Sequence, residues 1–176
     1  MRYADGPTAE VEVDVDASPE TVWAVVTDLN VPARFSDEFQ GAEWDGGSGG
    51  EVGARFTGRN RHPAAGEWTT QAVVTDYDAP RRFAYVIGEI ELPSAAWRFE
   101  LEPLARGAGT RLRQWARMGP GPSGLTSAIA ARPDAEERIV ARRLEEWRAN
   151  MRATVEGIKA LAEQANTEAE GGRLEE

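Results

Sequence analysis

The chain opens with a strict alternation of polar and apolar residues over 9–16, AEVEVDVD. Val11, Val13 and Val15 share one face, and four carboxylates share the other. This period of two predicts a half-buried strand with one solvated face. The same period recurs in six later segments, which are separated by turns rich in Gly, Pro or Asp: 42–44, 54–62, 67–77, 82–87, 96–104 and 110–118. Such short connections predict an antiparallel meander.

A helical period follows the first strand. Ser18 is a predicted N-cap, and Pro19 occupies the first helical position, where its missing N–H is not needed. Apolar residues then recur at the spacing of one helix face: Val22, Val25, Val26 and Leu29. Pro32 is expected to end this helix, because the residue before a proline avoids the α region. A second short, aromatic helical piece is expected to reach Phe39 and to turn toward the concave side of the sheet.

The pattern becomes helical again after the Gly- and Pro-rich segment 119–124. Residues 125–132 are expected to form a short helix that Pro133 interrupts, and Asp134 with Glu137 forms a predicted capping pair. A long amphipathic helix follows, with apolar residues three or four apart: Val140, Leu144, Trp147, Met151, Val155, Ile158 and Leu161. These patterns predict an N-terminal tail over 1–7, a single domain over 8–165 and a disordered acidic tail over 166–176.

The predicted fold is therefore α+β: a curved, seven-stranded antiparallel sheet around a long C-terminal helix, with two short helices after the first strand. Three segments in this order resemble the SRPBCC superfamily of START-like, helix-grip proteins, in its polyketide cyclase/dehydrase branch: SPETVWAVVTDLNVPARFSDEF, VGARFTGRNR and AWRFELEPLARGAGTRLRQW. The resemblance spans about residues 8–162. That family includes carriers and aromatase/cyclases, so the resemblance implies the helix-grip fold without selecting one reaction.

Composition narrows the possible partners. The formal net charge of −10 disfavours binding to nucleic acid or to anionic membrane surfaces. There is no cysteine, and His62 is the only histidine, so thiolate chemistry and histidine-based zinc sites are not expected. We find no apolar leader and no apolar run of the ~20 residues that span a bilayer. The expectation is a cytoplasmic monomer or homodimer with no metal and no membrane insertion.

One segment fits the spacing of a dinucleotide-binding loop. Residues 119–124, GPGPSG, match G-x-G-x-x-G after a strand. Pro120 and Pro122 have no N–H to offer a phosphate, however, and no βαβ crossover is predicted here. We therefore interpret the segment as a stiff connection and expect no cofactor.

The apolar faces of the strands and helices suggest a binding site for a hydrophobic small molecule, because bulky aromatic walls are typical of such cavities. Ordinary core packing is the alternative for each residue taken singly. The predicted ligand-binding residues are Phe35, Phe39, Phe56, Asn60, Tyr85, Trp97, Phe99, Gln114, Met118, Trp147 and Met151.

Two amides share a face with these apolar residues. An unpaired buried amide costs ~1–3 kcal/mol, so Asn60 and Gln114 should bond to each other, to water or to a ligand. Glu38 is the candidate catalytic residue, since burial beside Asn60 would raise its pKa and suit it to acid–base work. Surface charge is the alternative for Glu38, and His62 is expected to lie in an exposed turn.

The functional expectation has two alternatives. The chain binds a hydrophobic, polycyclic or polyketide-like molecule in an internal cavity and either catalyses its cyclisation or dehydration, or only carries or senses it. A third reading, an interaction surface built on alternating arginines of two strands, ranks below both, because those arginines are expected to form ion pairs across strands.

Overall fold

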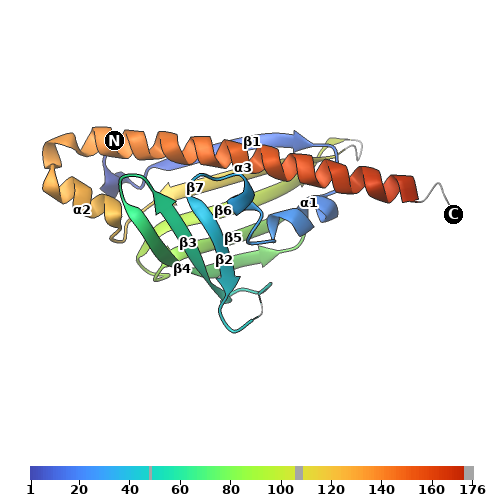
Figure 1. The fold of residues 1–176 in the computed structure, drawn as a ribbon, viewed down its shortest axis with the longest axis horizontal. Coiled ribbons are helices and arrows are strands. Elements are labelled where there is room, and N and C mark those ends of the chain that lie inside the picture. Colours follow the sequence, from blue (N-terminus) through green and yellow to red (C-terminus); the bar gives the residue numbers. More distant parts are fainter. Residues whose placement is uncertain (48, 106–108, 173–176) are drawn as a thin grey trace.

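The computed structural model describes residues 1–47, 49–105 and 109–172. Within them, one seven-stranded antiparallel sheet has the order β1-β7-β6-β5-β4-β3-β2 (Figure 1). The strands are β1 (Thr8–Val15), β2 (Phe39–Trp44), β3 (Arg55–His62), β4 (Gly66–Asp78), β5 (Arg82–Gly88), β6 (Pro93–Pro103) and β7 (Thr110–Met118). The helices are α1 (Pro19–Val26), α2 (Gly124–Ala131) and α3 (Glu136–Gly172), with one-turn 3-10 helices η1 (Tyr3–Asp5), η2 (Pro32–Arg34) and η4 (Pro133–Ala135). The predicted fold class is confirmed.

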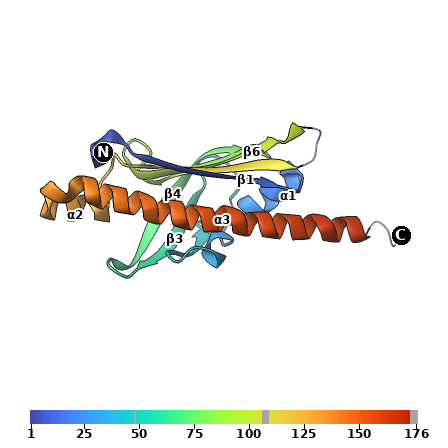
Figure 2. The same cartoon turned by 90° about the horizontal axis from the view of Figure 1, so that it is seen from above.

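The long helix α3 lies on the concave side of the sheet and packs chiefly along β1. Seen from above, β1 and the β3–β4 hairpin lie on opposite sides of the helix axis (Figure 2). Leu144 and Met151 are 1% and 2% exposed, which confirms that the predicted apolar stripe of the helix faces the sheet. Because α3 runs along β1, it covers the inner face of β3–β6 less completely than that of β1.

The break after α1 has a specific structural role. Ser18 caps the helix as predicted, but the helix ends at Val26 rather than Leu29, and the second piece is only the single turn η2. Phe39 already belongs to β2. Between the two helices, the side-chain amide of Asn30 accepts a bond from the Ala42 N–H (3.0 Å) and donates one to the Ala42 carbonyl (3.1 Å). The interruption thus places Asn30 against the free edge of β2.

Both ends of the chain differ from the expected tails. Tyr3 is 7% exposed, and its hydroxyl donates to the Gly121 carbonyl at 2.7 Å, so part of segment 1–7 is packed. At the other end α3 continues to Gly172, so residues 166–172 are helical rather than disordered. Residues 173–176 lie outside the described part of the chain.

The outer face of the sheet carries the predicted ion pairs. Arg111 bonds to Asp14 at 2.9 Å, and Arg113 bonds to Glu12 at 3.4 Å. The hydrogen bond from Arg111 lowers the pKa of Asp14. These arginines therefore have partners within the sheet. In the described ranges, no helix combines the length and the apolar character needed to cross a membrane.

Candidate functional site

The inner face of the sheet carries a row of aromatic side chains in mutual contact. Phe56 lies 5.0 Å from Tyr85 between ring centroids, Tyr85 lies 5.6 Å from Phe83, and Phe83 lies 5.7 Å from Tyr77. Trp44 extends the row at 5.3 Å from Phe56. Each well-oriented aromatic pair contributes about 0.5–1.5 kcal/mol beyond the area it buries. The row is therefore a stable apolar wall across β3, β4 and β5.

A second aromatic contact joins the sheet to the long helix. The rings of Trp97 on β6 and Trp147 on α3 lie 4.8 Å apart. Trp147 is 9% exposed, whereas Trp97 is only half-buried. The pair joins β6 to α3 in the region where the sequence suggested a ligand.

Burial divides the predicted ligand-binding residues into two groups. One group belongs to the closed core, with at most 9% exposure: Phe56, Phe99, Gln114, Met118, Trp147 and Met151. The other group stays half-buried: Phe35, Phe39, Asn60, Tyr85 and Trp97. The second group combines apolar rings with partial access from outside, which is the property that a small-molecule site requires.

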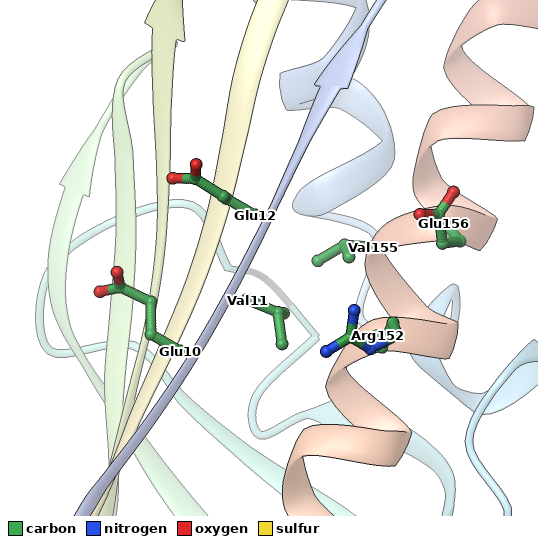
Figure 3. Close-up of a pocket in the computed structure, with 6 residues that line it drawn as sticks. All are labelled: Glu10, Val11, Glu12, Arg152, Val155 and Glu156. Carbon is green, nitrogen blue, oxygen red and sulfur yellow. The ribbon is translucent and has the colours of Figure 1, made fainter.

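The structure also contains two surface pockets away from these residues. One, of about 280 Å³, lies between β1 and α3 and is lined by Glu10, Val11, Glu12, Arg152, Val155 and Glu156 (Figure 3). Val11 points toward α3, whereas Glu10 and Glu12 point to the other side of the strand. The second, of about 380 Å³, lies beside the segment between α1 and η2 and the strand β2. The predicted ligand-binding residues line neither pocket.

The pocket beside β1 interrupts a row of contacts that protects a sheet edge. A free strand edge is a template for unwanted pairing, and proteins commonly cover it. Side chains of α3 bond to the backbone of β1 and the residue after it on both sides of the pocket: Arg148 to the Thr8 carbonyl, Lys159 to the Asp14 carbonyl and Glu163 to the Asp16 N–H. We therefore interpret this groove as part of the edge, not as the ligand site.

Glu38 does not lie in the site as a free carboxyl group. Both of its oxygens accept bonds from the guanidinium of Arg143, each at 2.6 Å. The two side chains are 15% and 19% exposed. Burial acts to lower the pKa of Arg143, but the hydrogen bonds and charges of Glu38 and Glu146 outweigh it and raise that pKa. This two-pronged pair occupies both carboxylate oxygens of Glu38.

His62 is connected to the same ion-pair network. Its Nδ1 accepts a bond from the Ala64 N–H at 3.1 Å, and its Nε2 lies 3.6 Å from Glu146 on α3. The side chain is 21% exposed, so the expected solvent-exposed turn histidine is instead partly covered. Burial acts to raise the pKa of Glu146, but hydrogen bonds from Arg142 and Arg143 outweigh it and hold that pKa below its usual range.

The polar groups of the inner face differ in how well they are satisfied. Asn60 donates to the hydroxyl of Thr70 at 3.3 Å. Gln114 is 6% exposed, and its Oε1 accepts no hydrogen bond from the described residues. The hydroxyl of Tyr85 also forms no hydrogen bond within the described ranges, and burial raises the pKa of this phenol. The site thus offers one unused acceptor and one unused, protonated donor among apolar walls.

Sequence reasoning missed two contributors to this region. Thr70 is the partner of Asn60, and Arg143 holds Glu38 and lies 5.8 Å from the ring of Trp147. Arg143 stands one helical turn before Trp147, so its position near the apolar stripe was readable from the spacing. The pairing of Thr70 with Asn60 depends on the β3–β4 register, which the turn alone did not specify.

Comparison with known families gives a match over most of the chain. Residues 7–163 match the model of the family described as polyketide cyclase / dehydrase and lipid transport. No curated protein matches the chain.

Solved structures share the fold. The polyketide-cyclase-like protein Cgl2372 from Corynebacterium glutamicum is 27% identical, with a TM-score of 0.60 over 93% of this chain and 94% of that one. The di-domain ARO/CYC StfQ from the steffimycin biosynthetic pathway is 15% identical, with a TM-score of 0.66 over 90% of this chain and 51% of that one. The di-domain ARO/CYC BexL from the BE-7585A pathway is 19% identical, with a TM-score of 0.62 over 89% and 50%. This chain thus corresponds to about half of each di-domain protein.

Proposed function

The chain belongs to the polyketide cyclase / dehydrase and lipid transport family, and we propose that it binds a polycyclic or polyketide-like molecule on the inner face of its sheet. Family membership implies a hydrophobic ligand. The inner face of β3–β6, together with α3, is where the chain offers apolar rings and unused polar groups to such a molecule.

One observation carries this proposal. Tyr85 and Trp97 face each other across β5 and β6 and are only half-buried, although they stand on the concave side of the sheet. Partly exposed rings on a concave face favour a flat apolar ligand, because covering their remaining surface removes apolar area from water at about 25 cal/mol per Å². Trp147 adds a further ring from α3, which contacts Trp97 at 4.8 Å between ring centroids.

Carriage of the ligand is the activity that this geometry favours. The carboxylate of Glu38 is bound to Arg143 and is not available as a free acid. Cyclisation or dehydration is the second candidate, and one observation favours it: the unbonded hydroxyl of Tyr85 keeps its proton and can donate to a ligand carbonyl.

A fluorescence titration tests the proposed binding. The neutral, environment-sensitive dye N-phenyl-1-naphthylamine should bind with a dissociation constant on the order of 1 μM, about −8 kcal/mol. Trp97→Ala should weaken binding at least about tenfold. The matched control is Trp115→Ala, because Trp115 lies on the outer face. There the guanidinium carbon of Arg98 lies 4.6 Å from the centroid of its ring. Absence of saturable binding, or equal losses in both variants, would contradict the proposal.

A further inference from the structure

Gln114 is the most deeply placed amide of the inner face. It lies on β7, where it pairs with Val11 of β1 on one side and Phe99 of β6 on the other. Both neighbours are buried, at 8% and 2% exposure, and Gln114 itself is 6% exposed. A polar side chain in this setting normally has a hydrogen-bond partner.

Two other polar side chains of the inner face follow that rule. Thr110, fully buried on the same strand, donates to the Ala17 carbonyl at 2.8 Å, and Asn60 donates to Thr70. Gln114 is different, because its Oε1 is buried and accepts no bond from the described residues. An unsatisfied buried group of this kind destabilises the fold. Its presence at this position therefore points to a partner that is not part of the chain.

The position of Gln114 connects it to the proposed ligand site. Trp97 pairs directly with Ala116, so Gln114 is the diagonal neighbour of Trp97 on the same face. Diagonal neighbours across a strand pair lie about 7–8 Å apart, within reach of an aromatic side chain. Ala116, which separates them along β7, is a small and fully buried residue, and Trp147 contacts Trp97 from the helix side. A ligand that packs against this tryptophan pair therefore lies beside Gln114.

We propose that Gln114 determines ligand specificity by accepting a hydrogen bond from a hydroxyl group at the buried end of the ligand. This inference rests on the proposed function and narrows the ligand class to polycyclic molecules that carry a hydroxyl. The buried, unbonded atom of Gln114 is the acceptor Oε1, so a ligand that offers only carbonyl oxygens at that end leaves this atom unpaired.

Four related probes test this assignment: anthracene, 2-hydroxyanthracene, anthraquinone and 2-hydroxyanthraquinone. Binding of each is measured by fluorescence titration to the full chain and to Gln114→Met, which has nearly the same shape without the amide. In the natural chain the hydroxyl should strengthen binding about tenfold, both for anthracene and for anthraquinone. In Gln114→Met this tenfold preference should vanish, while anthracene itself binds equally well. Gln71→Met is the matched control, because Gln71 is exposed on the outer face, bonds to Thr57 and should leave the preference intact.

Thermal unfolding supplies an independent readout. Replacing an unpaired buried amide by an apolar side chain should leave the melting temperature unchanged or raise it. A lower melting temperature, or failure of Gln114→Met to fold, would show that the amide is bonded structurally and would overturn the inference. Equal binding of all four probes, or a preference for the carbonyl alone, would also overturn it while the proposed function stands. Failure of every probe to bind would overturn both.

Discussion

At the scale of single residues, charged side chains connect three separate segments. Arg143 on α3 holds Glu38, which precedes β2, and also bonds to Glu146 at 3.2 Å. Glu146 in turn lies near His62 at the tip of the β3–β4 hairpin. The network connects the segment before β2 and the β3–β4 hairpin to α3, and it occupies the carboxylate of the candidate catalytic residue Glu38.

Glu38→Gln should lower the free energy of unfolding by about 1–3 kcal/mol, because it leaves the partly buried guanidinium of Arg143 without its charged partner. Urea unfolding measures this change. Glu43→Gln is the matched control, since the Glu43–Arg59 pair is largely exposed and contributes little. If the two variants lost the same stability, Glu38 would not have the role assigned to it.

Glu146 should make stability depend on pH. Its pKa is held below the ordinary value of 4.5 in the folded chain, so the unfolded chain takes up its proton first as the pH falls. The contribution of Glu146 is therefore fully present above its unfolded pKa and is lost as the pH falls through the lowered folded value. Unfolding curves of the natural chain and of Glu146→Gln should differ at pH 7 and converge under acid. A difference that persists or grows below pH 4 would contradict this assignment.

At the scale of elements, both edges of the sheet are covered by side chains. Residues of α3 bond along β1, and Asn30 bonds to both backbone groups of Ala42 on β2. The period of the sequence predicted the strands and the buried stripe of α3, because both patterns are local. It did not predict the role of Asn30 or the packing of Tyr3, because those contacts join residues 12 and 118 positions apart.

Asn30→Ala should lower the free energy of unfolding by about 1–2 kcal/mol, since two backbone groups at the edge of β2 lose their partners. Asn30→Asp keeps the acceptor for the Ala42 N–H and loses only the donor, so its cost should be smaller. Chemical denaturation of the three proteins gives the order. Equal stability of all three would show that the edge does not need this cap.

At the scale of the whole molecule, the alternation of residues along the strands predicted which side chains lie on the inner face, but not how deeply each is buried. It placed Gln114 and Asn60 on the inner face, and Gln114 is indeed buried there. It could not separate core residues such as Phe99 from half-buried ones such as Tyr85, because that depends on where α3 crosses the sheet. It also gave no account of Glu38, whose partner is 105 positions away.

The central claim, that a hydrophobic ligand binds on the inner face beside α3, is tested most directly by nuclear magnetic resonance. The six tryptophans give indole N–H signals that single Trp→Phe variants assign. On titration with 2-hydroxyanthraquinone, the signals of Trp97 and Trp147 should shift in a saturable manner, and that of Trp115 on the outer face should stay in place. Unchanged signals of Trp97 and Trp147, or shifts confined to Trp115, would contradict the account.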